Sequence, residues 1–213
     1  MSKKVVIVDY QIGNIFSVQH ACAKTGLNSK ISSSVKEIFD SHALILPGVG
    51  AFNEAMQNIH KLKMFEALQK YANSGRPVFG ICLGLQLLFT KSSEFKNCNG
   101  LNLIQGEVKK MKKHPNAKIP HMGWNKINQA EQSNWDNTPL KNATINSCFY
   151  FVHSFAADPK KNEYVLCTTD HGDSKYCAAV LKENIFATQF HPEKSGKIGL
   201  KIYEDWSKIN KLT

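Results

Sequence analysis

Cys82 stands in a setting that suits covalent chemistry. It follows the short apolar run 77–81, lies between Gly80 and Gly84, and precedes an apolar helical pattern that begins at Leu83. A strand, a sharp turn and a helix in this order are typical of a nucleophile elbow, which exposes the side chain at the turn. Glycine suits both flanking positions because a Cβ would crowd the turn. The N–H groups of the following helix favour a thiolate and a nearby oxyanion. The pattern predicts a cysteine that bonds covalently to its substrate.

A cysteine nucleophile needs a base, and the base needs a group that orients it. His191 and Glu193 fit these roles because they follow apolar segments that predict a strand, and residues two apart in an extended chain point the same way. Glu193 would hold one imidazole nitrogen while the other faces Cys82, and Pro192 would fix the backbone between them. The carboxylate two residues on favours His191 over the other histidines. These are His20, His42, His60, His114, His121, His153 and His171, of which His121 and His153 compete most closely.

A glycine-rich turn, Pro47-Gly48-Val49-Gly50, joins a predicted strand at 43–46 to a predicted helix that starts near Phe52. A free backbone N–H in such a turn can point at an oxyanion, and the same geometry also suits a phosphate. The turn lacks the Lys-Ser/Thr ending of a P-loop and is not a G-x-G-x-x-G string, which disfavours nucleotide binding. An oxyanion-binding turn and a simple tight turn both remain open from these residues.

The composition is that of a soluble globular domain. With 213 residues, 42% of them hydrophobic and 21% charged, the chain suits one domain spanning 1–213. No stretch approaches the ~20 apolar residues of a membrane helix. The apolar run at 5–8 is too short for a signal peptide, so we expect a cytoplasmic protein. The six cysteines form no C-x-x-C pair, so no metal or cofactor is expected.

The formal net charge is +10, and the densest basic run is Lys109-Lys110-Met111-Lys112-Lys113-His114. Such a run can bind nucleic acid. It contains no interleaved aromatic residues and no nucleic-acid motif surrounds it, so we favour the solvated rim of a hairpin and expect no nucleic-acid partner. A basic surface that attracts an acidic partner protein is the third possibility.

Strand and helix patterns alternate through the first half of the chain, which predicts an α/β domain with a parallel sheet. After Gly100, strands separated by turn residues predict antiparallel pairs, and a helical pattern through Trp206 ends the chain. The polar stretch 128–142 predicts a surface loop. The predicted strands are 5–8, 43–46, 77–81, 106–111, 126–127, 148–152, 164–168, 178–181 and 185–189, and the predicted helices begin near residues 15, 52, 62, 83 and 198.

The strings around the nucleophile and the base, Gly80-Ile81-Cys82-Leu83-Gly84-Leu85-Gln86 and Gln189-Phe190-His191-Pro192-Glu193, resemble the motifs of the class I (triad) glutamine amidotransferases. Within that family the chain is most similar to the glutaminase subunits of imidazole glycerol phosphate synthase. The similarity extends over about residues 4–206, and its most specific string is Pro120-His121-Met122-Gly123-Trp124-Asn125. The resemblance implies a single three-layer, flavodoxin-like domain with a mainly parallel central sheet and additional antiparallel strands in the C-terminal half.

The same resemblance implies a Cys-His-Glu triad. Cys82 attacks the carboxamide carbon of glutamine, His191 carries the proton, and Glu193 orients His191. The implied oxyanion hole is formed by backbone N–H groups at Val49, Gly50 and Leu83. The implied substrate-binding residues are Gly50, Gln86, His153, Ser154 and Phe155.

The resemblance also implies a partner subunit. In these enzymes a synthase of the (β/α)₈ barrel type forms a heterodimer with the glutaminase and uses the ammonia. The implied interface residues are Pro120, Met122, Trp124 and Lys194. Free ammonia is mostly protonated at neutral pH, and a chain this short has little room for an acceptor site of its own, so a sealed passage to a partner makes physical sense.

Three alternatives stand beside this interpretation. A related subunit could supply ammonia to a barrel partner for an amidino sugar of a surface polysaccharide. A cysteine hydrolase or peptidase could use a similar elbow, but it would leave the Pro120–Asn125 string without a role. A non-catalytic interaction subunit is disfavoured by the intact cysteine, histidine and glutamate set.

Overall fold

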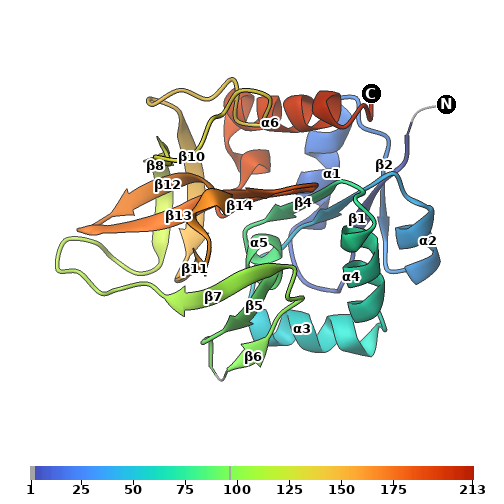
Figure 1. Ribbon diagram of the computed structural model, residues 1–213, viewed down its shortest axis with the longest axis horizontal. Coiled ribbons are helices and arrows are strands. Elements are labelled where there is room, and N and C mark those ends of the chain that lie inside the picture. The colour runs from blue at the N-terminus through green and yellow to red at the C-terminus, as the bar shows by residue number, and fades with distance from the viewer. Residues whose placement is uncertain (1–2, 96) are drawn as a thin grey trace.

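The computed structural model describes residues 3–95 and 97–213; residues 1, 2 and 96, which fall within the predicted domain range 1–213, lie outside the described residues. An eight-stranded sheet forms the centre (Figure 1). Its strands, in spatial order, are β2 (Ser29–Ser32), β1 (Val5–Val8), β3 (Ala43–Leu46), β4 (Val78–Ile81), β14 (Ile185–Thr188), β13 (Ser174–Lys182), β12 (Val165–His171) and β9 (Asn128–Gln129). The strands from β2 to β14 run parallel, and the last three continue the sheet in antiparallel pairs.

Helices cover both faces of this sheet (Figure 1). One face carries α1 (Ile15–Lys24) and α6 (Gly196–Ile209), and the other carries α3 (Phe52–Lys61), α4 (Phe65–Asn73) and α5 (Leu83–Leu87). In β1, Val5 and Ile7 pack with the first group, and Val6 and Val8 pack with the second. A strand that is buried on both faces is apolar at every position, which explains the short continuous apolar runs of the sequence.

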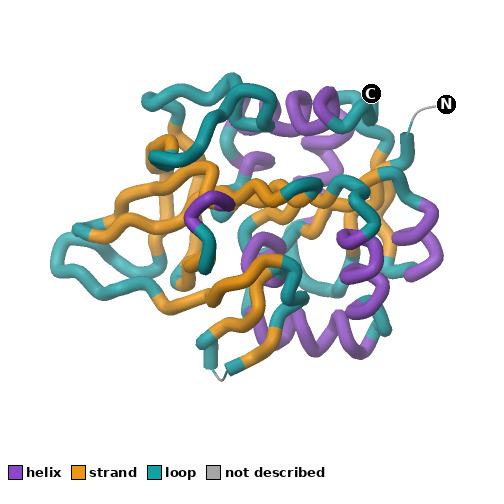
Figure 2. The backbone as a smooth tube through the Cα atoms, viewed as in Figure 1, coloured by secondary structure: helices purple, strands orange, loops and turns teal. Residues whose placement is uncertain are grey.

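Two smaller sheets complete the fold, and Figure 2 shows their strands beside the helix-rich part of the chain. The first is the antiparallel pair β8 (His121–Lys126) and β10 (Cys148–His153). The second contains β11 (Phe155–Pro159), β7 (Ile104–Lys110), β5 (Phe89–Ser92) and β6 (Cys98–Asn99), in that order. The remaining elements are the helix α2 (Val35–Asp40) and the 3-10 turns η1 (Asn162–Tyr164) and η2 (Pro192–Lys194).

The predicted α/β class, with a mainly parallel sheet and antiparallel strands in the C-terminal half, is confirmed. The sequence did not predict β2 or α2, which lie at the edge of the sheet. Both carry few buried apolar side chains, so their hydrophobic pattern is weak. The strand expected at 126–127 is misplaced. The observed strand β8 begins at His121, and exposed residues alternate with buried or half-buried ones along it, so it forms no apolar run.

The helix expected after Cys82 is much shorter than its apolar pattern suggested. It ends at Leu87, and Phe89 already begins strand β5. All five residues of α5 and the following Leu88 and Phe89 are buried, so no polar face marks where the helix ends. Periodicity cannot distinguish a buried helix from a buried strand in such a run.

The stretch 128–142 is not the simple surface loop that its polarity predicted. Trp135, Thr138 and Leu140 are buried, and Trp135 donates a hydrogen bond of 2.8 Å from Nε1 to the carbonyl of Leu166. Most of the other side chains here are exposed, so the loop covers the core with only a few residues. In the described part of the chain, no helix has the length and apolar character needed to cross a membrane.

Gly84 makes the tightest backbone contact of the elbow region. A Cβ at this position would lie 1.8 Å from the carbonyl oxygen of Leu46 in β3. Replacing glycine by alanine inside a helix normally stabilises it by about 1 kcal/mol. Here we expect Gly84→Ala to destabilise the fold by about 3 kcal/mol or more, because α5 must move away from the sheet.

Urea denaturation measures this loss. Gly80→Ala is the matched control, because its Cβ would lie 3.0 Å from the Cβ of Ala187, and its loss should be clearly smaller. Equal stability of Gly84→Ala and the wild type would show that the packing of α5 on β3 is not tight.

Candidate active site

Cys82 occupies a strained turn between β4 and α5. Its backbone has φ 53° and ψ −105°, a conformation that residues with a side chain rarely adopt. The turn is held from the neighbouring strand, because the Cys82 amide donates a hydrogen bond of 2.7 Å to the carbonyl of Thr188. The strand, the turn and the helix therefore present the thiol at the carboxyl end of the parallel strands.

His191 and Glu193 meet just beyond the end of β14. His191 Nδ1 lies 2.7 Å from Oε1 of Glu193, and both side chains are almost fully buried. The extended segment expected here is instead the 3-10 turn η2, with His191 at its start. Ser195 fixes this turn by donating from its hydroxyl to the carbonyl of His191 at 2.6 Å. The pair is thus positioned by a turn rather than by strand alternation.

The second imidazole nitrogen of His191, Nε2, is buried and has no well-formed hydrogen bond among the described residues. Burial by itself lowers the pKa of His191. The negative charge of Cys82 and the carboxylate of Glu193 outweigh burial and raise the pKa to about 10. An imidazolium is therefore favoured between these two groups at neutral pH.

The turn Pro47–Gly50 faces the elbow. The hydroxyl of Tyr10 donates a short hydrogen bond to the carbonyl of Pro47, and burial, followed by the charge of Cys82, raises the pKa of Tyr10. The Leu83 amide donates a hydrogen bond of 3.4 Å to the Gly48 carbonyl. A hydrogen bond of this length is weak, so another acceptor can displace the Gly48 carbonyl. Within residues 3–95 and 97–213, the amides of Val49 and Gly50 donate no hydrogen bond. The Gly48 carbonyl points at the Leu83 amide. Because a trans peptide directs its C=O and its N–H in opposite directions, the Val49 amide of the same peptide points away from Leu83.

A cavity of about 270 Å³ opens at Cys82. It brings together all of the residues that the sequence assigned to the oxyanion hole and the substrate, and it also includes Pro120 and Val152. His191 and Glu193 do not line it. The lining residues are Val49, Gly50, Cys82, Leu83, Gln86, Glu94, Pro120, Val152, His153, Ser154 and Phe155.

Gln189 is a site residue that the sequence pattern did not single out. It is fully buried, and its Nε2 lies 3.5 Å from Sγ of Cys82. Its Oε1 accepts a hydrogen bond of 3.1 Å from Nε2 of Gln86. The side-chain amide of Gln189 is thus directed at the sulfur of the candidate nucleophile. The only sequence signal was its place directly before Phe190-His191.

Glu94 is the one acidic side chain among the described residues that line the cavity. Its Oε2 accepts a hydrogen bond of 2.8 Å from the amide of Phe52, at the start of α3. This hydrogen bond holds the carboxylate in place at the helix N-terminus. The site therefore combines a nucleophile with a fixed negative group that can bind an ammonium.

The strand β8 places two large apolar side chains in solvent. Met122 is 63% exposed and Trp124 is 59% exposed. Lys194 lies beside them, because its Nζ is 5.8 Å from the ring of Tyr150, and that ring is 6.2 Å from the ring of Trp124. Three of the predicted interface residues thus share one surface, while Pro120 lies at the cavity.

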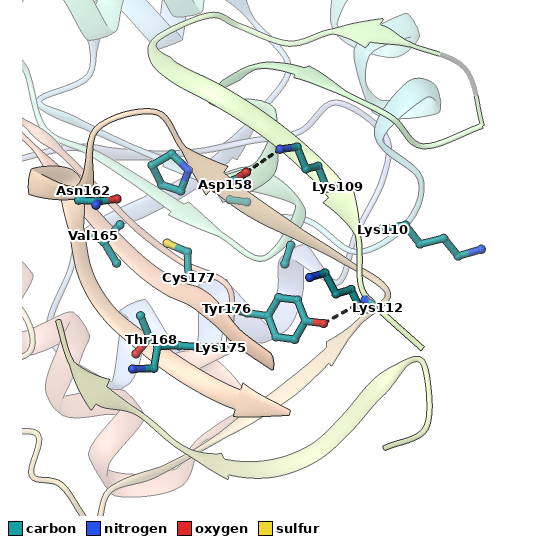
Figure 3. A pocket seen from close by; sticks show the side chains of 13 residues that line it. Lys109, Lys110, Lys112, Asp158, Asn162, Val165, Thr168, Lys175, Tyr176 and Cys177 are labelled. Atoms are coloured by element: carbon teal, nitrogen blue, oxygen red, sulfur yellow. Dashed lines mark hydrogen bonds and ion pairs between the residues drawn. The ribbon is translucent and has the colours of Figure 1, made fainter. Parts of the chain in front are cut away.

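The basic run lies outside this site. A second cavity, of about 380 Å³, is lined by Lys109, Lys110, Lys112 and Lys175 among others and shares no lining residue with the Cys82 cavity (Figure 3). Lys109 is paired with Asp158 at 2.6 Å. The four lysines of the run, Lys109, Lys110, Lys112 and Lys113, are solvent-exposed, as expected. The expected hairpin is wrong, because β7 pairs with the distant strand β11.

The Cys82 site contains the parts of an acyl-transfer centre. It has a cysteine at a turn, a charged histidine beside it, a carboxylate that orients the histidine, and the Leu83 amide as a backbone donor next to the thiol. The neighbouring cavity can hold a small molecule that carries an ammonium group.

Comparisons with known proteins agree with this chemistry. The family model for glutamine amidotransferase class-I matches residues 6–206. The chain is 46% identical over 200 residues to a Lactococcus lactis protein named imidazole glycerol phosphate synthase subunit HisH, covering 94% of this chain and 96% of that protein. It is 40% identical over 210 residues to a Legionella pneumophila protein named imidazole glycerol phosphate synthase subunit HisH 1. This match covers 96% of this chain and 99% of that protein.

The fold is shared more widely. The solved structure of PurLQS from Thermotoga maritima superposes with a TM-score of 0.71 at 20% identity, covering 98% of this chain and 99% of the matched chain. At this identity the similarity shows the fold alone.

The raised pKa of His191 predicts how stability changes with pH. The folded chain keeps a proton that an unfolded histidine loses near pH 6.5, so this contribution is complete below pH 6.5 and is lost as pH rises toward about 10. Glu193→Gln keeps an acceptor for Nδ1 but removes the charge. We expect it to lower the free energy of unfolding by about 1–3 kcal/mol at pH 6 and by less at pH 9.

Urea denaturation of both proteins at the two pH values tests this. Glu163→Gln, at an exposed glutamate in η1, is the control and should change little at either pH. A difference between Glu193→Gln and the wild type that stays constant with pH would contradict a charged His191.

Proposed function

The chain belongs to the class I glutamine amidotransferases, and we propose that it is the glutaminase subunit of an imidazole glycerol phosphate synthase, acting in histidine biosynthesis. One observation carries this proposal: Cys82, His191 and Glu193 share one buried site in a chain that matches proteins of that name over almost its whole length. The reaction is the hydrolysis of glutamine to glutamate and ammonia.

In the first half of the reaction, the Cys82 thiolate attacks the carboxamide carbon and forms a C–S bond. The carbonyl oxygen becomes an oxyanion, which the Leu83 amide and the amides of Val49 and Gly50 stabilise after the Gly48–Val49 peptide turns its carbonyl away from Leu83. When the tetrahedral intermediate collapses, the C–N bond breaks and His191 gives its proton to the departing nitrogen. The products of this half are ammonia and a thioester on Cys82.

In the second half, His191, now neutral, takes a proton from water. The resulting hydroxide attacks the thioester carbon, the C–S bond breaks, and glutamate leaves with the regenerated Cys82 thiolate. Glu193 holds Nδ1 of the imidazole throughout and stabilises its charged form, so Nε2 is the atom that exchanges the proton.

The substrate lies in the cavity at Cys82. Gly50, Gln86 and the backbone of His153, Ser154 and Phe155 contact glutamine. Glu94 pairs with its α-ammonium group, which gives the fixed carboxylate at the start of α3 a function.

The ammonia passes to a (β/α)₈ barrel subunit. The exposed surface formed by Met122, Trp124 and Lys194, together with Pro120, is the docking site for this partner. Exposed aromatic and methionine side chains are typical of interface cores. The amidino-sugar pathway and the peptidase alternatives have no comparable support from the relatives.

Two further properties belong to the proposal. The whole chain, 1–213, works as one glutamine amidotransferase domain, because the family match at 6–206 leaves only short ends outside it. The protein acts in the cytoplasm, where the substrates of amino-acid biosynthesis are found.

Replacing the nucleophile tests the function. In the complex with the barrel subunit of the same organism, Cys82→Ala should lower glutamine-dependent product formation on the order of 10⁶-fold, because the thiol forms the first bond. With ammonium salts instead of glutamine, the variant should match the wild type, because the barrel site is intact. Glutamine-dependent synthesis by Cys82→Ala would end the proposal, and synthesis of an amidino sugar would redirect it.

Glu94→Gln tests the binding of the substrate ammonium. The amide keeps an acceptor for the Phe52 amide but loses the charge, so we expect KM for glutamine to rise about tenfold with kcat within about twofold of the wild type. Glu54→Gln, in the first turn of the same helix but away from the cavity, is the matched control. Equal KM values for Glu94→Gln and the control would exclude this role.

A further inference from the structure

Two buried histidines face each other across the small sheet. His121 in β8 and His153 in β10 are direct partners in the antiparallel register, and they are only 4% and 6% exposed. Nδ1 of His121 lies 3.2 Å from Nε2 of His153. Asn125, further along β8 on the same face, places its Nδ2 3.1 Å from Nε2 of His121. We call Asn125, His121 and His153 the histidine relay.

The relay has one direction, which its last acceptor sets. Nδ1 of His153 lies 2.9 Å from the carbonyl of Phe155, which can only accept, so this nitrogen carries the proton. In a neutral ring Nε2 of His153 must then accept from Nδ1–H of His121. Nε2 of His121 must in turn accept from the Asn125 amide, whose other hydrogen goes to the carbonyl of Asp170 at 2.7 Å.

Both rings are held neutral by their surroundings. Burial is the main cause that lowers the pKa of His121 to about 4 and of His153 to about 3. The titratable groups that face them are His171 of β12, whose ring is stacked on His121 at 4.2 Å, and His191. Positive charge on His171 contributes to the lowered pKa of both rings, and positive charge on His191 contributes to that of His153. A proton added to Nε2 of His153 would also face the Nδ1–H of His121, so two donors would oppose each other.

The relay ends in the glutamine cavity. The Phe155 carbonyl accepts a second hydrogen bond, of 2.9 Å, from Nε2 of Gln86. The same Gln86 nitrogen donates to Oε1 of Gln189, which leaves Nε2 of Gln189 directed at Sγ of Cys82. A continuous chain of hydrogen bonds therefore joins strand β8 to the nucleophile.

The outer face of β8 carries the exposed Met122 and Trp124, while its inner face carries His121 and Asn125. We propose that the histidine relay positions the Phe155 carbonyl and the Gln86 amide for glutamine, and that it transmits contact on the outer face of β8 to the glutamine cavity. The proposal rests on the proposed function and adds two positioning residues, His121 and His153, whose imidazole rings act through Phe155 rather than on the substrate itself.

Variants at His121 separate hydrogen bonding from packing. His121→Phe keeps a ring between Phe151 and His171 but loses the donor to His153, whereas His121→Asn keeps an N–H near the position of Nδ1. In the complex with the barrel subunit, we expect His121→Phe to raise KM for glutamine about tenfold with kcat within about threefold of the wild type. We expect His121→Asn to stay within about threefold of the wild-type KM.

The ratio of glutaminase activity with and without the barrel subunit measures the transmission. It should fall at least threefold in His121→Phe and remain unchanged in His171→Phe, the matched control outside the relay. Equal KM values and equal stimulation for the phenylalanine and asparagine variants at position 121 would overturn the positioning role and leave only packing.

Imidazole ¹⁵N NMR on the full chain, labelled at histidine, tests the relay independently of activity. Both His121 and His153 should carry their proton on Nδ1, and neither should titrate between pH 8 and pH 5. A proton on Nε2 of either ring, or a titration near pH 6.5, would overturn the relay even if His121→Phe proves unstable. A wild-type complex without glutaminase activity would instead defeat the proposed function, with the NMR result still deciding the relay.

Discussion

The turn at Cys82 is the constraint on which the rest of the site depends. A cysteine at φ 53° and ψ −105° is held in place only if the surrounding chain excludes other conformations. Two contacts do this: the Thr188 carbonyl accepts the Cys82 amide, and Gly84 lies so close to the Leu46 carbonyl that no side chain fits. Three neighbouring parallel strands therefore fix one backbone turn, and a smaller or less tightly packed sheet could not.

The electrostatics of the site depend on this closeness as well. Burial disfavours a charged imidazole, and a buried unpaired charge would cost several kcal/mol. His191 nevertheless has its pKa raised, because a negative group lies on each side of the ring. His153, which is also deeply buried but has only N–H and carbonyl partners, has its pKa lowered to about 3. Two buried histidines near one cavity thus differ in charge because of their partners, not their exposure.

The sequence was informative where function depends on neighbours along the chain. The elbow and the His191–Glu193 pair are local patterns, and both were predicted, although η2 replaces the expected extended segment. Gln189, Glu94 and the histidine relay depend on contacts between residues 32 to 107 positions apart, so no spacing in the sequence indicates them. The split of the apolar run into α5 and β5 was equally hidden, because burial on all sides removes the periodicity.

The two faces of β8 are tied together by its register. Successive side chains alternate, so a slip of one residue against β10 would turn Met122 and Trp124 inward and expose His121 and Asn125. Such a slip would break the hydrogen bonds of the inner face, because each group of the histidine relay is paired with a specific donor or acceptor. The polar inner face therefore fixes the position of the apolar outer face. It follows that the surface around Trp124 has its position set by the polar side chains on the inner face of β8.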